Sequence, residues 1–328
     1  MGRNGSVCWG IVGTAQIVVD SFLPALRATG DEAAVVIGGR DPQRTRQFAR
    51  ANDIDHAVES YDAVLADPSV EAVYVPLPNS MHAEWTIKAL ESGKAVLCEK
   101  PLCISLAQTE QVLEVAGRTH GLLWEAFVFP FRSQFARLRE IIQSEEIGRL
   151  EELQANFHWR IDNPNDIRLS PQLGGGALND VGCYCIHFAT LLIGAAPVDA
   201  AALVTEAPEG VDEAMRGTIA HENGATSQFS CGMRQYKDTF SRILCTKGEI
   251  RVSSPYHPSS TDTIEVRAGD SVRTERPTGR EPSFTPALQH IHAVLRGDEP
   301  PRHLAVSDSL ETARAMQLVR DVAHRAGS

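Results

Sequence analysis

The sequence lacks an excess of basic side chains and lacks a long apolar run. Its 328 residues carry 42 acidic against 31 basic side chains, a formal net charge of −11 at pH 7. This balance argues against nucleic acid or an anionic membrane as a partner, because both attract positively charged surfaces. No apolar run approaches the ~20 residues of a membrane span, and no apolar signal region precedes the strand-like run at residues 7–12. We therefore expect a cytoplasmic protein.

The cysteines lack the spacing of a metal site or a disulfide framework. There are seven, an odd number, and most lie in apolar runs. Cys183 and Cys185 are separated by one residue, and no second Cys/His pair accompanies them. We predict that all seven are reduced core thiols. We also predict no catalytic metal, because no set of His, Cys and carboxylate side chains has ligand spacing.

The first part of the chain alternates short apolar runs with helix-like stretches. The apolar runs cover residues 7–12, 33–38, 72–75, 95–98 and 122–126. Strands of four to six residues alternating with helices of about ten are typical of βαβ units and a parallel sheet. We predict an α/β dinucleotide-binding domain of the Rossmann type over residues 1–125.

The pattern changes after residue 125. A long strand is predicted at 150–159 and a helix at 182–192. Apolar-alternating runs then follow each other from 200 to 267 with Gly, Pro and Asn turns between them, which is typical of an antiparallel meander. Two helices, at about 285–296 and 307–325, end the chain. We predict an α+β substrate-binding domain over residues 126–328, with an open, largely antiparallel sheet.

The turn after the first strand resembles a pyrophosphate-binding turn. A Gly-rich turn between a strand and a helix holds a dinucleotide pyrophosphate through backbone N–H groups. Here Gly13-x-Ala15-x-x-Val18 stands in place of Gly-x-Gly-x-x-Gly/Ala. Ala15 still permits close backbone approach, whereas Val18 crowds the contact between helix and sheet. An ordinary tight turn is the alternative interpretation.

The end of the second strand indicates which nicotinamide cofactor is bound. Enzymes that prefer NAD place a carboxylate there for the ribose 2′-hydroxyl. This chain has Gly38-Gly39-Arg40, with Arg44 one turn into the next helix. An arginine can pair bidentately with a 2′-phosphate. NADP is the predicted cofactor, with NAD as the alternative.

Two further loops follow predicted strands of the same sheet. Pro76 and Pro78 stiffen the first loop, which would place Asn79 and His82 over the nucleotide crevice. A capping role for Asn79 and a structural role for His82 are the alternatives. In the second loop, Lys100 follows the 95–98 run and can reach the ligand crevice at the carboxyl end of the sheet. A solvated loop lysine is the alternative there.

Together the motifs resemble a known family. Gly13-Thr-Ala-Gln-Ile17, Pro78-Asn-Ser-Met-His82, Cys98-Glu-Lys-Pro-Leu102 and Gly174-Gly-Gly-Ala-Leu-Asn-Asp-Val-Gly-Cys-Tyr184 occur in this order. The chain resembles the glucose–fructose oxidoreductase/inositol dehydrogenase (Gfo/Idh/MocA) family of NAD(P)-dependent oxidoreductases over essentially its whole length. The resemblance implies sugar or cyclitol substrates and a Rossmann domain followed by an α+β domain. It also implies a homodimer or homotetramer that assembles through the open sheet.

The resemblance also assigns roles to single residues. It implies Lys100 at the reacting carbon and a cis peptide bond at Lys100-Pro101, and an X-Pro bond is where such a bond is most readily accommodated. Tyr184 stands where inositol-type members carry histidine, as in the branch that includes dimeric dihydrodiol/xylose dehydrogenase. Pro130 stands where relatives usually carry arginine, so the substrate cannot be copied from any one of them. The expected cofactor contacts are Gly13, Thr14, Ala15, Gln16, Ile17, Gly39, Arg40, Arg44, Pro76, Leu77, Asn79, His82, Glu99 and Lys100.

The residue types also suggest a mechanism on chemical grounds. Asp180 and Tyr184 are spaced i, i+4 on the predicted helix, with His187 at i+7, and would share one face. A free tyrosine has a pKa near 10, and a neighbouring lysine would lower it. Tyr184 is the predicted acid/base, Lys100 its electrostatic partner and Asp180 the orienting group. The alternative is that Lys100 carries the proton. Arg160, Arg168, Phe129 and Tyr236, together with Asp180 and Tyr184, are the predicted substrate contacts.

The predicted function is therefore an NADP-dependent oxidoreductase that transfers a hydride between nicotinamide and a sugar or polyol. Either the oxidation of an aldose at C1 or the reduction of a ketosugar fits. The alternative, from a different class, is a sugar- or nucleotide-sensing protein that keeps the fold without turnover. The presence of Lys100, Asp180 and Tyr184 favours the enzyme, because a sensor does not need a proton carrier.

Overall fold

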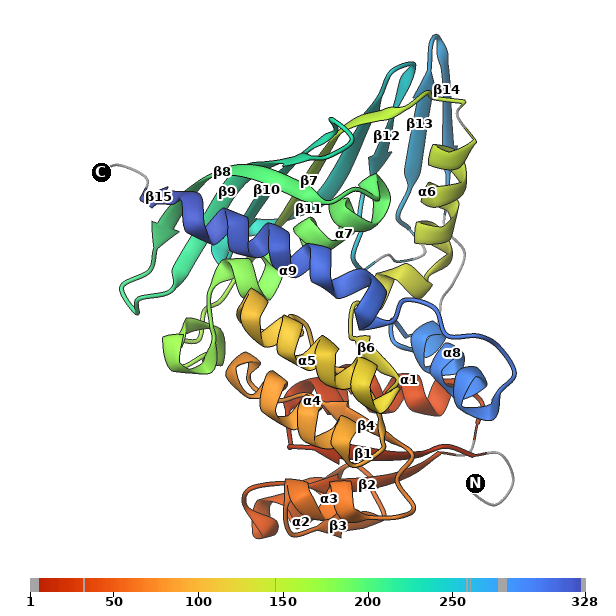
Figure 1. Cartoon of the computed structure of the whole chain (residues 1–328), viewed down its shortest axis with the longest axis vertical. Helices are drawn as coiled ribbons and strands as arrows, with labels where there is room; N and C mark the ends of the chain where they lie inside the picture. Colours follow the sequence, from red (N-terminus) through yellow and green to blue (C-terminus); the bar gives the residue numbers. More distant parts are fainter. Residues whose placement is uncertain are drawn as a thin grey trace. The chain divides into compact units, whose positions relative to one another are not determined.

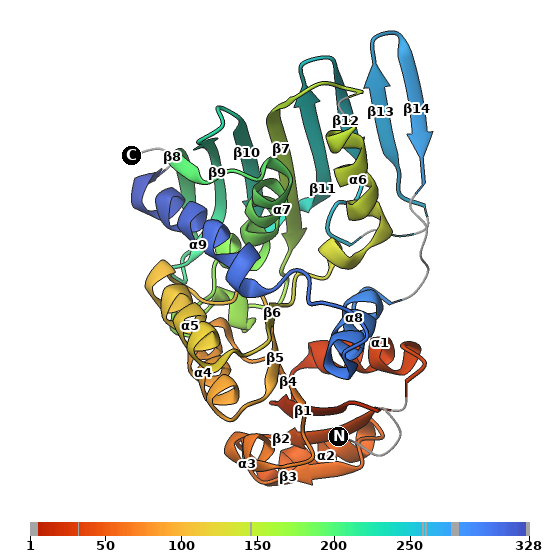
Figure 2. The same ribbon diagram turned by 45° about the vertical axis from the view of Figure 1, so that its right-hand side comes forward.

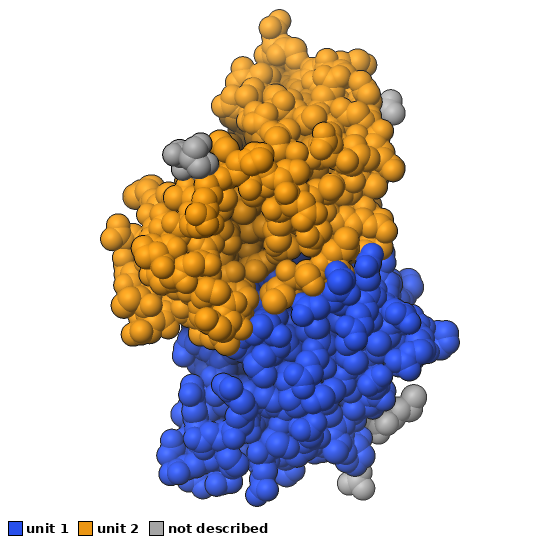
Figure 3. Space-filling view, turned by 60° about the vertical axis from the view of Figure 1, so that its left-hand side comes forward, with its two compact units in different colours: residues 1–103, 107–128, 281–307 blue, residues 104–106, 129–280, 308–328 orange. Residues whose placement is uncertain are grey.

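The computed structural model describes residues 6–31, 33–144, 146–257, 259, 261–276 and 282–325. The chain forms two compact units (Figure 3): residues 1–103, 107–128 and 281–307 form unit 1, and residues 104–106, 129–280 and 308–328 form unit 2. The boundary predicted at residue 125 lies close to residue 128, where the second segment of unit 1 ends. The return of 281–307 to unit 1 was not predicted, since a local helical pattern does not show where a helix packs.

The centre of unit 1 is a parallel six-stranded sheet with the order β3-β2-β1-β4-β5-β6. This strand order is that of the doubly wound dinucleotide-binding fold. The neighbouring strands β4 and β5 are buried along their whole length, which agrees with their continuous apolar sequence. The strands are β1 (Cys8–Val12), β2 (Ala34–Gly38), β3 (His56–Val58), β4 (Ala72–Val75), β5 (Ala95–Cys98) and β6 (Leu123–Glu125).

Helices cover both faces of this sheet (Figure 2). On one face Trp9, Phe22 and Tyr74 form an aromatic cluster with Phe284. On the other face Val64 and Trp85 belong to a large aliphatic core. The helices of unit 1 are α1 (Leu23–Ala28), α2 (Pro42–Ala51), α3 (Tyr61–Ala66), α4 (His82–Glu91), α5 (Leu106–Thr119) and α8 (Thr285–Arg296), with a π-helical turn at Val18–Phe22 and a 3₁₀ turn at Asn79–Met81.

Unit 2 contains a nine-stranded sheet with the order β14-β13-β12-β11-β7-β10-β9-β8-β15. The meander prediction is wrong in one respect: β7 lies between β10 and β11, and it runs parallel to β10. The sequence pattern identified the strands but could not show that an earlier strand inserts between two later ones. The strands are β7 (Leu150–Arg160), β8 (Pro197–Glu206), β9 (Asp212–His221), β10 (Thr226–Gly232), β11 (Arg234–Cys245), β12 (Gly248–Val252), β13 (Ile264–Ala268), β14 (Ser271–Glu275) and β15 (Ala323–Arg325).

The helices of unit 2 lie on one face of this sheet (Figures 1 and 2). Among the described residues, no helix covers the opposite face, so the sheet is open there, as predicted. The helix α6 was not anticipated. The helices are α6 (Ser133–Gln143), α7 (Cys183–Ile193) and α9 (Ala305–Val322), with a π-helical turn at Leu178–Gly182 and 3₁₀ turns at Phe129–Phe131, Ile167–Leu169 and Pro171–Leu173.

One helical stretch is long and apolar enough to cross a membrane, contrary to the expectation from the sequence. It covers Pro171–Ile193, and 83% of its most apolar window is buried inside the protein. A soluble protein's core helix has the same length and composition, so this stretch is weak evidence for a membrane span. Its apolar side chains instead pack against the sheet of unit 2, where α7 lies over β7 and β10.

Candidate active site

The turn after β1 brings together the ends of three strands of unit 1. Gly13 has φ +112°, and its N–H donates to the Gly38 carbonyl at 2.8 Å. A Cβ on Gly13 would lie only 3.0 Å from the Leu77 side chain, so glycine is favoured by both space and conformation. Val18 is fully buried and begins a π-helical turn, which is wider than an α-helical one.

The remaining residues of the predicted pyrophosphate turn follow Gly13 directly. Thr14 and Ala15 form the loop, and Gln16 and Ile17 begin the helical run. A Cβ on Gly39 would lie 3.8 Å from the Thr14 methyl group, so the loops after β1 and β2 are adjacent. The Gln16 amide donates to Asp20 at 2.8 Å on the exposed side of the helix. The predicted contacts on these two loops therefore form one continuous surface.

The loop after β2 presents two arginines. Arg40 and Arg44 are both exposed, and no described carboxylate lies within ion-pair distance of either. The neighbouring Asp41 cannot take the place of a ribose-binding carboxylate, because its side chain accepts from the N–H groups of Gln43 and Arg44 and caps α2. Arg40 and Arg44, with no described carboxylate beside them, are suited to bind a phosphate group at this strand end.

His82 lies in the interior of unit 1 and not on the surface of the nucleotide crevice, where it was predicted. Its ring is fully buried, with Nδ1 2.7 Å from the Pro101 carbonyl oxygen and Nε2 2.8 Å from that of Leu77. Burial lowers the pKa of His82, the two carbonyls oppose this, and the charge of Lys100 lowers it further. No surface remains for a ligand, so we assign His82 a positioning role between the loops after β4 and β5. Pro76 is also buried, and Asn79 begins the 3₁₀ turn.

The segment that carries Lys100 is fixed on both sides. The Lys100-Pro101 bond is cis, as predicted. The Tyr74 hydroxyl donates to Glu99 Oε1 at 2.6 Å, and the Lys100 N–H donates to Glu99 Oε2 at 3.2 Å. Glu99 thus holds the backbone of the lysine, and its two oxygens are already engaged. Lys100 itself is half-buried at the carboxyl end of β5, next to the strand-order reversal between β1 and β4.

In unit 2, Asp180 is held by two donors. Its Oδ1 accepts from Arg168 Nε at 3.0 Å and its Oδ2 accepts from Trp159 Nε1 at 3.1 Å. The Arg168 guanidinium also lies over the Trp159 ring, 5.3 Å from the centroid. Burial lowers the pKa of Arg168, but Asp180 and Asp166 outweigh it, and the net shift is upward. Arg168, a predicted substrate contact, therefore also orients Asp180.

Tyr184 is buried among aromatic rings. Its ring centroid lies 5.5 Å from Phe157, 5.6 Å from Tyr256 and 5.2 Å from His257. Phe157 and Trp159 are two residues apart on β7 and share a face, so Tyr184 and Asp180 both face this strand. His257 comes from the segment after β12, and no local pattern in the sequence associates it with Tyr184.

The predicted polar stripe does not extend to His187. Its Nδ1 lies 2.8 Å from the hydroxyl of Thr312 on α9, and its ring packs against Phe129. The π-helical turn before α7 changes the angular spacing, so the assumption of a regular helix fails here.

The other predicted substrate contacts differ in how deeply they are buried. Phe129 is 1% exposed and packs in the core with Phe135 and Phe188. Arg160 pairs with Asp162 at 2.6 Å on the surface, and Tyr236 is 92% exposed. Lys100 belongs to unit 1 and Tyr184 to unit 2, so their pairing stays a prediction. Among the described residues, no group of three or more His, Cys, Asp or Glu side chains could hold a metal ion.

Comparison with protein-family models decides the relationship. A model described as an oxidoreductase family with an NAD-binding Rossmann fold matches residues 7–127, and the GFO/IDH/MocA C-terminal domain matches residues 135–251. The chain belongs to the GFO/IDH/MocA oxidoreductase family. The family resemblance and the α/β fold expected from the sequence are confirmed.

Family members with known activities cover most of this GFO/IDH/MocA chain. It is 36% identical over 260 residues to D-xylose 1-dehydrogenase (NADP(+)) 2 of Haloferax volcanii, covering 79% of each chain. It is 31% identical over 252 residues to trans-1,2-dihydrobenzene-1,2-diol dehydrogenase of Sus scrofa, covering 75% of this chain and 74% of the relative.

A family member of known structure has the same fold. It is a 3-ketoreductase of Actinomadura kijaniata in complex with NADP and TDP-benzene, with a TM-score of 0.88, 29% identity and 98% of each chain covered. The same reductase has been solved with one tyrosine replaced by phenylalanine and with one lysine replaced by alanine.

Proposed function

We propose that the protein is an NADP-dependent oxidoreductase that transfers a hydride between nicotinamide and a hydroxyl-bearing carbon of a sugar or polyol. The observation that carries the proposal is the Asp180–Tyr184 helix start, where a doubly held carboxylate precedes a buried phenol. Relatives named as an NADP-dependent xylose dehydrogenase and a sugar 3-ketoreductase support the substrate class. The seven free thiols agree with a cytoplasmic location, which we include in the proposal.

The cofactor would be held by the strand ends of unit 1. The N-terminus of the helix after Gly13 suits a pyrophosphate, because its N–H groups and dipole favour an anion. Arg40 and Arg44 would receive the 2′-phosphate of NADP. The bound nicotinamide supplies hydride transfer, while the chain's own residues orient the substrate and move the proton.

In this proposal Tyr184 exchanges a proton with the substrate oxygen, and Lys100 is its electrostatic partner. A hydroxyl must lose its proton as the hydride leaves, so a phenolate of lowered pKa acts as base in oxidation and a phenol acts as acid in reduction. Asp180 would accept a hydrogen bond from a substrate hydroxyl while Arg168 and Trp159 keep it in place. Lys100 as the proton carrier is the alternative assignment.

A substrate panel tests the proposed function. Purified protein would be mixed with aldoses and NADP, and separately with ketosugars, free and nucleotide-linked, and NADPH, while absorbance at the NADPH band is followed. Turnover of at least one sugar with NADP in either direction is expected. Tight binding of NADP with no turnover over the whole panel would favour the sensing protein instead.

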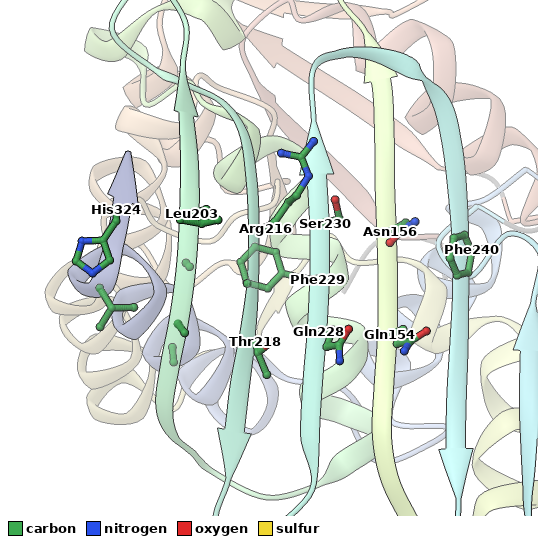
Figure 4. Close-up of a pocket in the computed structure, with 15 residues that line it drawn as sticks. Gln154, Asn156, Leu203, Arg216, Thr218, Gln228, Phe229, Ser230, Phe240 and His324 are labelled. Carbon is green, nitrogen blue, oxygen red and sulfur yellow. The ribbon is translucent and has the colours of Figure 1, made fainter. Parts of the chain in front are cut away.

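We also propose that the open face of the unit 2 sheet joins copies of this chain as a homodimer or homotetramer. The hollow that this face forms over β7, β8, β9 and β10 is lined mostly by uncharged side chains, among them Gln154, Asn156, Thr218, Gln228 and Ser230, with Arg216 as an exception (Figure 4). Leu203 and Phe240 add apolar area, with 54% and 37% of their surface exposed. A largely uncharged area with exposed apolar side chains is suited to self-association.

The oligomeric state tests this interface. Light scattering coupled to size exclusion should give a multiple of the 35.7 kDa chain. Leu203→Glu with Phe240→Glu should lower the mass to one chain, or from tetramer to dimer, because buried charge opposes association. Val306→Glu, at another exposed apolar side chain, is the matched control and should change nothing. A monomeric unmodified protein at micromolar concentration would refute the proposed interface.

A further inference from the structure

The helical run that carries Asp180 and Tyr184 begins at Leu178, and its first N–H groups have no partner within the helix. A carboxylate from another element supplies the acceptor. Asp212, the first residue of β9, accepts from the Leu178 N–H through Oδ2 at 2.6 Å, and the Ala177 N–H also lowers the pKa of this carboxyl. A strand-borne aspartate thus caps the helix from outside.

The loop before the helix is shaped around this carboxylate. Gly176 has φ +110°, and a Cβ on it would lie 2.0 Å from Asp212 Oδ1. Any side chain at residue 176 would push the carboxylate away from the helix start. The third glycine of the Gly174-Gly-Gly motif is therefore needed to let Asp212 close on the helix.

The hydrogen bonds of Asn179 connect the start of this helix to the glycine loop and to α9. Asn179 donates through Nδ2 to the carbonyls of Gly174 and Gly175 at 3.0 and 3.2 Å, and its Oδ1 accepts from Arg320 Nη2 at 2.5 Å. The charge of Arg320 also acts on Asp212. Strand β9, helix α9 and the glycine loop therefore converge on the first turn of the helix that carries the proposed acid/base.

The ionised carboxylate of Asp212 lowers the stability of the folded protein. Burial raises the pKa of Asp212 to about 6, although the N–H groups of Leu178, Asp212 itself and Ala177 and the charge of Arg320 oppose the rise. The other titratable groups that interact with this pair are Cys231, Cys183 and Asp321. Because the folded pKa lies above the ordinary value of 3.8, the contribution of Asp212 to stability decreases as pH rises from about 4 to about 6.

We propose that Asp212 is a positioning residue whose ionised carboxylate fixes the start of the helix and thereby the places of Asp180 and Tyr184. The inference rests on the role proposed above for Tyr184. A protonated Asp212 loses its charge at the positive helix end and turns one acceptor oxygen into a donor. Tyr184 follows Leu178 by fewer than two turns, so a shift of the helix start reaches the phenol. A misplacement of about 1 Å can cost ~10²-fold in rate.

The test is the pH profile of kcat/KM for carbonyl reduction. In this direction the protonated phenol is the active form of Tyr184, so Tyr184 contributes no loss of activity toward acid. The unmodified enzyme should lose activity with an apparent pKa of about 6. Asp212→Asn should lack that step and should work at pH 8 about 10- to 100-fold below the unmodified enzyme. Its NADP affinity should be unchanged, and its melting temperature at pH 8 should not fall, because the variant removes a charge that opposes folding.

Substitutions at two further residues, Arg320 and His257, test whether the acidic step belongs to Asp212. Arg320→Met should move the acidic step to higher pH, because it removes the cation that favours the ionised form, and Arg320→Lys should restore it. His257→Gln is the matched control, since His257 is another titratable group beside Tyr184. An acidic step that persists in Asp212→Asn, or that disappears in His257→Gln, would overturn the proposal. So would an Asp212→Asn enzyme with a lower melting temperature and an unchanged profile.

Failure of this inference can be told apart from failure of the proposed function. Tyr184→Phe is measured in the same assay. If it is inactive while Asp212→Asn keeps the unmodified profile, only the positioning role of Asp212 is refuted. If Tyr184→Phe retains most of its turnover, the acid/base role itself is refuted, whatever Asp212→Asn does.

Discussion

The candidate residues of unit 1 and those of unit 2 are held in place by different chemical groups. In unit 1 the residues lie at the ends of parallel strands, and backbone groups hold them: Gly13 bonds the Gly38 carbonyl, and His82 lies between two carbonyls. In unit 2 they lie on one helix start, and charged side chains hold them: Arg168 binds Asp180, and Asp212 caps Leu178. The strand-end half depends on topology, whereas the helix-start half depends on individual side chains.

The difference has a physical consequence. Strand ends are fixed by a sheet whose strands β4 and β5 are fully buried, so a single surface substitution leaves their geometry in place. The helix start depends on ionised groups, and hydrogen bonds to charged groups are worth more and cost more when a partner is lost. Substitutions at the helix start of unit 2 should therefore affect turnover, and substitutions at the strand ends of unit 1 other than Lys100 should affect cofactor binding.

The largest effect is expected for the proposed pair of Lys100 and Tyr184. Tyr184→Phe should lower kcat by about 10²–10⁴ without changing NADP affinity, because the phenol acts on the transition state. Lys100→Ala should cost at least as much, and the double variant little more, since groups that act as a unit are not additive. Single-turnover rates and NADP titrations measure both. Independent, multiplying losses would show that Lys100 and Tyr184 do not form a pair.

A smaller loss is expected for the charge that orients Asp180. Arg168→Gln should lower kcat/KM roughly 10- to 100-fold, the equivalent of about 1.5–3 kcal/mol for a hydrogen bond to a charged group. Arg149→Gln is the matched control, because Arg149 pairs with Glu151 at an exposed site, where an ion pair is worth ~0–1 kcal/mol. Equal effects of the two substitutions on steady-state kinetics would contradict the role given to Arg168.

In unit 1 the expected effect concerns cofactor choice. NADP should bind more tightly than NAD, and Arg40→Ala should narrow the difference by about 1–3 kcal/mol, because a charge-assisted contact to the 2′-phosphate is lost. Dissociation constants for both cofactors measure the change, with the exposed Arg46→Ala as control. Equal affinities of the unmodified protein for NADP and NAD would exclude this assignment.

The smallest effect is expected for the pH dependence of stability in unit 1. Burial lowers the pKa of His82, His290 and His292. The unfolded chain then binds more protons than the folded one, so the unfolding free energy should fall as pH drops below about 6.5. His82→Gln should make this decline shallower in urea titrations between about pH 5 and pH 8. A decline of unchanged slope would show that His82 does not contribute to it.

The same contrast explains what could be predicted from the sequence. The parallel sheet, the loop positions of Gly13, Arg40 and Lys100, and the cis bond at Pro101 follow from local patterns or the family motifs. The insertion of β7, the burial of His82, and the contacts of Asp180 and Tyr184 with Arg168 and His257 depend on segments that meet only in the folded chain. Local periodicity identifies an element and its apolar face but does not show which distant element packs on it.

The return of α8 to unit 1 bears on how the chain folds during synthesis. Within unit 1, Trp9 Nε1 donates to His292 Nε2 at 2.9 Å, and Phe284 packs against Phe22 and Tyr74. Unit 2 likewise receives its last segment, residues 308–328, from the same end of the chain. On the ribosome, unit 1 therefore remains incomplete until residues 281–307 have emerged and unit 2 until the residues after 307 have emerged, so Trp9 and Phe22 lack their last packing partners until then.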